Sequence, residues 1–263
     1  MPEPPLKITV ATVCFNAADV IERTINSVEA QDYPHVEHLI VDGNSRDTTL
    51  QIVHRYQARN SVAAVPHEIN CLSEPDEGLY DAMNKATGLA TGDYILFLNA
   101  GDKFHAPTTL SDVATAAVRC GEPLPAVVYG DTDIVDGDGR FVRHRRLSPP
   151  RRLNWRSFAA GMVVCHQAFF ARTDLARQTP YDRRYRFSAD FDWCIRIMRE
   201  ARRRHLPLCN AGIVVADYLS EGLTTRNHRA SLKERFRIMV RHYGAVTTVG
   251  RHAWFVVRGI VKK

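Results

Sequence analysis

Short apolar runs and stretches with apolar residues at helical spacing follow one another along the first part of the chain. The runs are too brief for helices and predict strands buried on both faces, at residues 8–13, 38–41 and 94–98. Between the runs, apolar residues three or four apart predict helices at residues 20–28, 50–56 and 79–90. Strands and helices in this order indicate parallel strands joined by right-handed crossovers. The pattern predicts an α/β fold whose ligands bind at the carboxyl ends of the strands.

The middle of the chain predicts a second set of elements. A hairpin turn at residues 136–139 separates two predicted strands, residues 127–135 and 140–143. Residues 160–170 are a further apolar run, predicted as a strand, in which a His-Gln pair at 166–167 is embedded. Polar side chains in a buried strand need hydrogen-bond partners, so the first interpretation of this histidine is structural.

Positive charge is concentrated near the C-terminus. The chain carries a net charge of +6, and residues 226–263 hold ten Lys and Arg against one acid, Glu234, which leaves residues 1–225 at about −3. Apolar residues recur at helical spacing among these cations, at Leu232, Phe236, Met239/Val240 and Tyr243, followed by Trp254-Phe255-Val256-Val257. Such a basic amphipathic segment can lie on an anionic membrane surface. Alternatively, its apolar stripe packs on the rest of the chain or on a second copy, so a homodimer is a candidate assembly.

Composition narrows the class of protein. The length of 263 residues fits one large domain, or one domain with an appendage. The chain has no uninterrupted apolar window of about 18 residues, and residues 1–5 lack an apolar signal core, so we expect a cytoplasmic protein without a membrane span. The cysteines show no CxxC spacing, and several lie in apolar runs. We therefore expect reduced core residues, not disulfides or a zinc site, at Cys14, Cys71, Cys120, Cys165, Cys194 and Cys209.

Two acids lie at the carboxyl ends of predicted strands. Asp42 ends the strand at 38–41, and Asp102 follows the strand at 94–98. Both carboxylates would face one crevice. Because carboxylates and a diphosphate are all negatively charged, they can lie together there only with Mg²⁺ or Mn²⁺ between them. The pattern favours a metal–nucleotide substrate, although an Asp in a turn or at a helix cap is an equally common role for Asp102. A dinucleotide cofactor is excluded because the first strand-to-helix turn, residues 14–18, contains no glycine.

Residues 143–156 are rich in Arg and Pro and predict a surface loop. We interpret this run as a solvated connection, with a patch for an anionic acceptor as the alternative. No fold motif or aromatic platform of a nucleic-acid-binding protein accompanies the charge, so we expect no nucleic-acid partner.

Three motifs resemble family 2 glycosyltransferases. Residues 41–47, VDGNSRD, are similar to the VDDGSTD/VDGGSTD signature of that family, and residues 73–85, SEPDEGLYDAMNK, to the SExDxGxYDAMNKG motif of its bacterial polysaccharide branch. Residues 99–102, NAGD, stand where the family has its DxD-type metal motif. The resemblance covers residues 6–110 closely and continues more loosely to about 225. It implies a GT-A fold, a Rossmann-like mixed and mostly parallel sheet flanked by helices.

The resemblance also implies a division of the chain. Residues 1–225 would be the GT-A catalytic domain, with the nucleotide-sugar half at about 6–110 and the acceptor half at about 111–225. Residues 226–263 would be a basic amphipathic C-terminal helical segment.

The resemblance assigns roles by position. On the donor side, Val13 and Asn16 would line the base and ribose, Asp42 would hold the nucleoside, and Asp76 and Asn84 would approach the sugar-diphosphate. Asp102 would bind both the donor and the metal, Mn²⁺ or Mg²⁺.

On the acceptor side, Asp190 occupies the place of the family's general base, with a helix cap as its alternative role. His166 and Asp131 are acceptor-side candidates. The chain departs from the common pattern at Gly43, where many members have Asp, and at Met83, where many have Arg. It also has fewer acids at 99–102.

The implied activity is that of an inverting, metal-dependent glycosyltransferase of the hexosyltransferase type. It would move a sugar from a UDP- or GDP-sugar to a saccharide or lipid-linked acceptor in cell-surface polysaccharide or glycolipid assembly. The enzyme would be cytoplasmic and peripheral at the inner face of the membrane. Two alternatives stay open: a sugar nucleotidyltransferase, which would need a Gly- and Lys-rich loop that residues 12–18 do not provide, and a nucleotide-sugar-binding relative without turnover.

Overall fold

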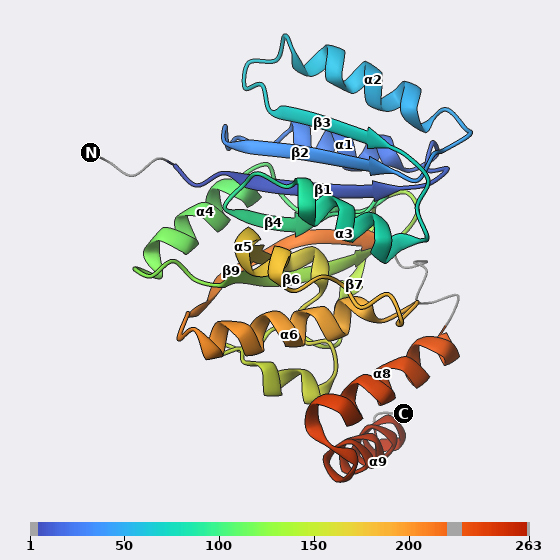
Figure 1. Cartoon of the computed structure of the whole chain (residues 1–263), viewed down its shortest axis with the longest axis vertical. Coiled ribbons are helices and arrows are strands. Elements are labelled where there is room, and N and C mark those ends of the chain that lie inside the picture. Colours follow the sequence, from blue (N-terminus) through green and yellow to red (C-terminus); the bar gives the residue numbers. More distant parts are fainter. Residues whose placement is uncertain (1–4, 220–227, 262–263) are drawn as a thin grey trace.

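The computed structural model describes residues 5–219 and 228–261, without the side chains of residues 228 and 254–261. Within these residues the fold is one mixed sheet of nine strands with helices on both of its faces (Figure 1). The predicted α/β class is therefore confirmed.

Four parallel strands form the first half of the sheet: β1 (Ile8–Cys14), β2 (Val36–Asp42), β3 (Glu68–Ser73) and β4 (Tyr94–Phe97). Strands β1, β2 and β4 are buried along their whole length, as their unbroken apolar runs predict. Strand β3 lies at the edge of the sheet, and each of its residues is at least partly exposed. The apolar pattern did not predict β3, because a partly exposed edge strand needs no apolar run.

Parallel and antiparallel strands are combined in the second half: β5 (Lys103–Phe104), β6 (Val127–Val135), β7 (Phe141–His144), β8 (Phe169–Arg172) and β9 (Leu208–Leu219). Strand β8 is antiparallel to both β4 and β6 and so joins the halves, in the order β3-β2-β1-β4-β8-β6-β9-β5. Strands β6 and β9 are parallel, whereas β7 pairs with β6 as the predicted hairpin.

The predicted strand at residues 160–170 is wrong over most of its length. Residues His166–Ala168 form a 3-10 turn, η2, and β8 begins only at Phe169. In a strand, successive side chains point to opposite faces of the sheet. The turn instead directs two adjacent polar side chains toward neighbouring acids, as described below.

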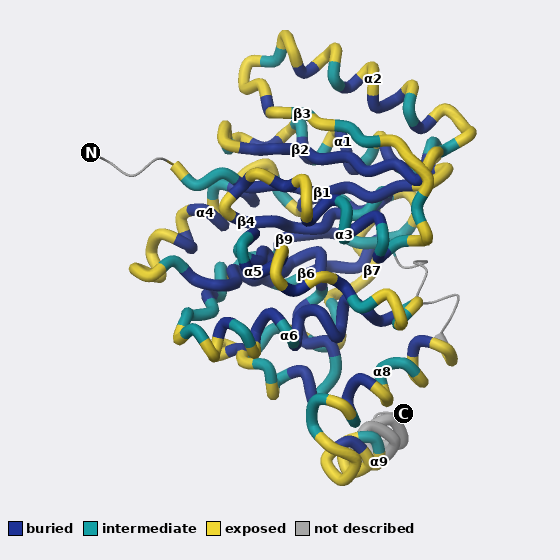
Figure 2. Tube along the Cα trace, viewed as in Figure 1, coloured by how far each residue is buried: buried dark blue, intermediate teal, exposed yellow. Residues whose placement is uncertain are grey.

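The helices form a layer on each face of the sheet. One layer contains α1 (Ile21–Glu29), α2 (Thr49–Asn60) and α4 (Thr109–Arg119). The other contains α3 (Leu79–Leu89), α5 (Thr173–Gln178), α6 (Ala189–Arg203) and the 3-10 helix η1 (Trp155–Ala160). Alternate residues of the strands enter the two cores: Val10 and Leu96 pack beneath α4, whereas Ala11 and Phe97 pack on the α3 and α6 side. Figure 2 shows the buried strands between the partly exposed helices.

Two C-terminal helices, α8 (His228–Tyr243) and α9 (Ala245–Val261), lie beside α6 and η1 at one end of the molecule (Figure 1). Helix α8 buries Ile238 and Met239. The predicted apolar stripe is packed only in part: Met239 is buried, whereas Leu232 is 46% exposed and Phe236 is 38% exposed. Helix α8 is covered on the side that faces α6 and η1. The spacing of apolar residues could not predict which side this is, because it depends on where α6 and η1 lie.

The side chains of Trp254 to Val257, which the membrane hypothesis also uses, lie outside the described part of the structure. Among the helices that the structure describes, none has the length and apolar character needed to cross a membrane.

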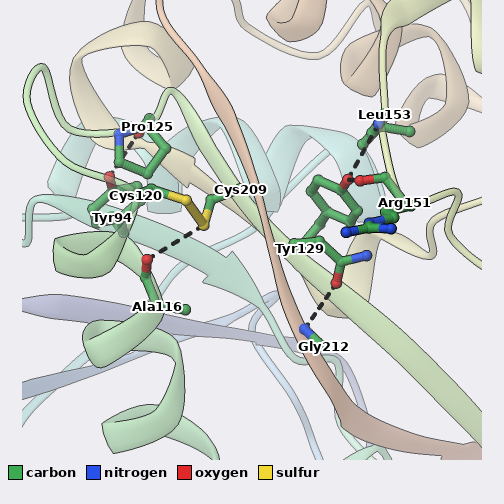
Figure 3. The surroundings of a disulfide bond; sticks show 10 residues. Tyr94, Ala116, Cys120, Pro125, Tyr129, Arg151, Leu153, Cys209 and Gly212 are labelled. Carbon is green, nitrogen blue, oxygen red and sulfur yellow. Dashed lines mark hydrogen bonds between the residues drawn. A yellow bond between two sulfur atoms is a disulfide. The ribbon is translucent and has the colours of Figure 1, made fainter.

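A disulfide joins Cys120, just after α4, to Cys209 in β9 (Figure 3). The expectation of reduced cysteines is therefore wrong for this pair. The two residues are separated by 89 positions in the sequence, and the packing of α4 against β9 brings them together. The other four cysteines, all within the described residues, are free: Cys14, Cys71, Cys165 and Cys194.

Candidate active site

Asp42 and Val13 lie at the carboxyl ends of the neighbouring strands β2 and β1, and both are buried. The Asp42 carboxylate accepts hydrogen bonds from the Ser45 backbone N–H at 2.9 Å and from the Ser73 hydroxyl at 2.7 Å. The Ser45 hydroxyl is a third donor. Asp42 therefore fixes the loops that follow β2 and β3 at the edge where the sequence placed the nucleotide.

Asn16 connects the loops that follow β1 and β2. Its side-chain oxygen accepts the Arg46 backbone N–H at 2.9 Å, and its own backbone N–H donates to the Ser45 hydroxyl at 2.7 Å. The backbone at Asn16 is left-handed, with a φ of 48°, a conformation that asparagine adopts more readily than most residues. Asn16 is exposed and faces the same edge of the sheet.

Asp76 approaches the backbone at Gly43 closely. A Cβ atom at position 43 would lie 2.5 Å from Asp76 Oδ2, so any side chain there would displace this carboxylate. The other oxygen, Oδ1, accepts the Gly78 backbone N–H at 2.8 Å. Glycine at position 43 therefore allows Asp76 to reach the end of β2, which gives a physical reason for one of the departures from the family pattern.

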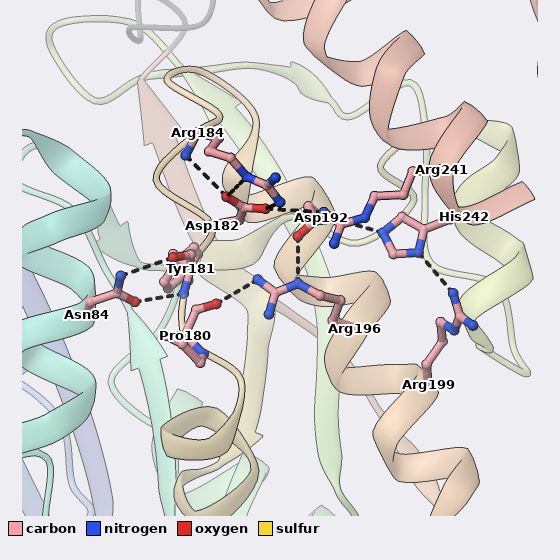
Figure 4. Close-up of polar contacts among 10 residues, drawn as sticks. All are labelled: Asn84, Pro180, Tyr181, Asp182, Arg184, Asp192, Arg196, Arg199, Arg241 and His242. Atoms are coloured by element: carbon pink, nitrogen blue, oxygen red, sulfur yellow. Dashed lines mark hydrogen bonds and ion pairs between the residues drawn. The ribbon is translucent and has the colours of Figure 1, made fainter.

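Asn84 joins α3 to the segment that precedes α6 (Figure 4). Its amide nitrogen donates to the Tyr181 carbonyl at 3.1 Å, and its amide oxygen accepts the Tyr181 N–H at 2.7 Å. Both ends of the Asn84 side chain are thus engaged by the backbone of another segment. The structure gives Asn84 this fastening role, and its predicted contact with the sugar-diphosphate is untested.

Replacing Asn84 with alanine is expected to lower the free energy of unfolding by about 1–3 kcal/mol, because the N–H and carbonyl groups of Tyr181 lose their partner. Urea denaturation of the variant would measure this loss. Asn26→Ala is the matched control, since Asn26 is exposed and, among the residues that the structure describes, its side chain bonds only that of Arg59. Equal stability of the two variants would contradict the fastening role.

Asp102 follows β4 and is 8% exposed. One carboxylate oxygen accepts the Gln167 side-chain amide at 3.0 Å, and the other accepts the Leu219 backbone N–H at 3.3 Å. Burial raises the pKa of Asp102 above its usual value, although these hydrogen bonds and the charge of Arg23 act in the opposite direction. A cation bound beside Asp102 would favour its ionised form.

Asp190 lies in the first turn of α6 and is 9% exposed. Its carboxylate accepts the Tyr80 hydroxyl at 3.2 Å and the Nδ1–H of His166 at 3.2 Å. Burial alone would raise the pKa of Asp190, but His166 and Arg235 outweigh burial and hold the pKa below its usual value. The carboxylate is therefore ionised near neutral pH and able to accept a proton.

The turn η2 connects these two acids. His166 donates to Asp190, and the next residue, Gln167, donates to Asp102. With the His166 proton on Nδ1, the other ring nitrogen accepts the side-chain amide of Asn99 at 3.2 Å. One turn thus holds the carboxylate at the end of β4 and the carboxylate at the start of α6.

Sequence reasoning missed two residues of this arrangement, Tyr80 and Gln167. Each had a signal, because Tyr80 lies in the 73–85 motif and Gln167 follows His166 directly. Asp131 is not brought into the arrangement. Among the described residues, its side chain bonds only the N–H of its neighbour Thr132, at 2.8 Å.

Asn99 and Asp102 supply oxygen atoms that fit a hard divalent cation. Asn99 Oδ1 is buried and has no hydrogen-bond partner in the described structure, so it is free to act as a ligand. Mg²⁺ and Mn²⁺ usually bind through one or two protein carboxylates plus phosphate oxygens of the substrate. The residues present therefore fit the expected metal.

A second group of potential metal ligands lies elsewhere in the sheet. Ligand atoms of His105, Asp133 and Asp217 lie within 4.8 Å of one another. These acids already have partners: Lys103 and His105 contact Asp217 at 3.0 and 2.8 Å, and His144 contacts Asp133 at 2.7 Å. This cluster is an alternative to the end of β4 for binding a cation.

Comparison with known proteins shows the family to which the chain belongs. Residues 9–178 match the family model described as glycosyl transferase family 2. An uncharacterized glycosyltransferase of Mycobacterium tuberculosis (strain H37Rv) is 34% identical over 194 residues, which cover 72% of this chain and 68% of that protein. A PGL/p-HBAD biosynthesis glycosyltransferase of Mycobacterium bovis (strain BCG / Pasteur 1173P2) is 34% identical over 198 residues, with coverage of 74% and 70%.

Solved structures share the fold. S. aureus TarS 1–349 in complex with UDP-GlcNAc gives a TM-score of 0.66 at 19% identity, over 95% of this chain and 73% of that one. The mannosyltransferase PcManGT from Pyrobaculum calidifontis, in complex with GDP-Man and Mn²⁺, gives 0.63 at 19% identity, over 91% and 66%. In a further TarS structure, the match spans only 40% of the TarS chain.

Proposed function

The chain belongs to glycosyl transferase family 2 and has a GT-A fold, and on this basis we propose that it transfers a sugar from a nucleotide-diphosphate sugar to an acceptor hydroxyl, with inversion at the anomeric carbon. One observation carries the proposal: adjacent residues of a single turn hold two buried carboxylates, Asp190 and Asp102. One carboxylate then acts on the acceptor and the other on the donor.

Asp190 is the proposed general base. The acceptor oxygen attacks the anomeric carbon on the face opposite the diphosphate, the bond to the diphosphate oxygen breaks, and the acceptor proton passes to Asp190. The low pKa of Asp190 keeps the base ionised, while Tyr80 and His166 orient its carboxylate. Burial and the neighbouring Asp190 raise the pKa of Tyr80 well above its usual value, so the hydroxyl remains a donor.

Asp102 and Asn99 are the residues that would hold Mn²⁺ or Mg²⁺. Such an ion stabilises negative charge on a leaving nucleoside diphosphate. Asp42, Asn16 and Asp76 would shape the nucleotide side of the crevice, with Val13 beneath them. In this arrangement residues 6–110 form the donor half, and residues 111–225 form the acceptor half.

We infer the substrate classes from relatives. Structures with the same fold hold UDP-GlcNAc or GDP-Man, which supports a UDP- or GDP-sugar as the donor. A relative named for PGL/p-HBAD biosynthesis supports a saccharide or lipid-linked acceptor in glycolipid or polysaccharide assembly. The exposed Leu232 and Phe236 of α8, with the exposed Lys233 beside them, would allow contact with the inner face of the cytoplasmic membrane.

A thermal-shift panel of UDP-, GDP- and dTDP-sugars, with and without Mn²⁺, tests the donor assignment. A ligand that binds only the folded protein raises the unfolding midpoint by mass action. We expect a shift for one nucleotide class, and we expect Mn²⁺ to enlarge it. The free sugars serve as controls and should give no shift. If no nucleotide sugar shifts the midpoint, the donor assignment is wrong. If a nucleotide sugar binds but no sugar is transferred, a non-catalytic relative is favoured.

A further inference from the structure

A basic pocket lies between α8 and the loop that precedes α6. Its volume is about 350 Å³, and it is lined by Arg184, Tyr185, Glu234, Arg237 and Arg241. Ligand pockets in proteins commonly measure about 300–1,000 Å³, so this one has room for a small anionic group. None of the lining residues comes from the strands or loops that form the nucleotide side.

The acids of this region are engaged within the protein. Glu234 accepts the backbone N–H groups of Arg186 and Phe187 at 2.9 and 2.8 Å. Asp182 accepts both ends of the Arg184 guanidinium, at 2.9 and 2.7 Å, and Arg241 at 3.2 Å (Figure 4). These contacts position two guanidinium groups at the pocket while they occupy the carboxylates.

Arg237 is the unpaired cation of the pocket. It is exposed, and it makes no hydrogen bond or ion pair with any residue in the described parts of the chain. The lining carries three arginines and one glutamate, a balance of +2, and the adjacent Asp182 reduces this balance to +1. Arginine groups bind phosphate oxygens through paired N–H donors, so a phosphate group fits both the charge and the donors.

Helix α8 also lies close to the candidate base. Glu234, which lines the pocket, accepts the backbone N–H of Phe187 at 2.8 Å. Ser231 of the same helix bonds Ser188, two residues before Asp190, at 2.9 Å. A group held in the pocket would therefore be near the acceptor side of Asp190 and away from the ends of β1 and β2.

We propose that this pocket binds a phosphate group of the acceptor. The assignment to the acceptor rests on the proposed function, whereas phosphate binding itself does not. The pocket differs from the Arg- and Pro-rich run at residues 143–156 that the sequence offered as an anionic-acceptor patch. Its cations come instead from α8 and from the loop before α6.

Calorimetric titration of inorganic phosphate at low ionic strength tests the pocket directly. Arg237→Gln should weaken phosphate binding about tenfold, because one charge-assisted contact is lost. Its exposed position makes a folding defect unexpected, and the thermal unfolding midpoint would verify this. Arg119→Gln, at an exposed arginine at the end of α4, is the matched control and should bind as the wild type does. Equal phosphate affinity in Arg237→Gln and the wild type would overturn the proposal.

Vesicles distinguish the source of the phosphate. Sedimentation with phosphatidylcholine vesicles that contain phosphatidic acid, compared with phosphatidylcholine alone, reports a lipid phosphate if Arg237→Gln abolishes the difference. If Arg237→Gln weakens phosphate binding but the wild type does not bind the vesicles, the acceptor is a soluble phosphorylated molecule. If no nucleotide sugar binds, the proposed function fails, yet the calorimetric comparison still decides whether the pocket takes phosphate.

Discussion

Replacing Asp190 with asparagine is expected to reduce kcat by about 10²–10⁴-fold while donor binding stays nearly unchanged. Asparagine has the size of aspartate, and its single side-chain oxygen can accept the His166 N–H while its amide donates to the Tyr80 hydroxyl oxygen, so the local packing should persist. It cannot take the proton of the acceptor hydroxyl, which is the proposed task of Asp190. Steady-state turnover together with the thermal shift caused by the donor measures both quantities.

A neighbouring acid provides the control. Asp192 lies in the same turn of α6, but it bonds His242 at 2.7 Å and Arg196 at 2.6 Å and has no contact with Tyr80 or His166 among the described residues (Figure 4). Asp192→Asn should reduce stability without a comparable loss of kcat from the folded protein. If Asp190→Asn lost donor binding and turnover to the same extent, Asp190 would have a structural role.

The second large effect is expected at Asp102. Asp102→Asn should lower the affinity for Mn²⁺ by more than about 100-fold, because loss of a direct ligand should exceed the 10–100-fold effects of residues around a metal site. The enlargement of the donor's thermal shift by Mn²⁺ should disappear as well. Titration of Mn²⁺ followed by electron paramagnetic resonance measures metal binding without relying on activity.

The control for Asp102→Asn comes from the other candidate metal site, the cluster of His105, Asp133 and Asp217. Asp133→Asn should leave Mn²⁺ binding intact if the metal sits at Asp102. The reverse result, with Mn²⁺ lost in Asp133→Asn and retained in Asp102→Asn, would move the metal assignment to that cluster.

Local patterns predicted strands β1, β2 and β4 of the first half, but not β3, and they predicted the positions of the main acids. Strands β1, β2 and β4 are apolar along their whole length because both faces are covered, and such runs are visible in the sequence. The positions of Asp42, at the end of β2, and of Asp102, in the segment after β4, are visible because the apolar run of each strand marks where it ends. These are properties of a few consecutive residues.

The contacts that join the acids could not be predicted in the same way. Gln167 reaches Asp102 across 65 positions, and Tyr80 reaches Asp190 across 110. The apolar neighbours of His166 predict a strand, but His166 and Gln167 lie in a turn, from which they bond Asp190 and Asp102. The Cys120–Cys209 disulfide and the buried side of α8 likewise depend on which elements meet in space.

The turn η2 connects the two carboxylates, so we expect cation binding at Asp102 and protonation of Asp190 to influence each other. Thermodynamic linkage is reciprocal. If a cation at Asp102 lowers the proton affinity of Asp190, then protonation of Asp190 lowers the affinity of the site for the cation by the same factor. Metal affinity should then vary with pH through a group that does not touch the metal.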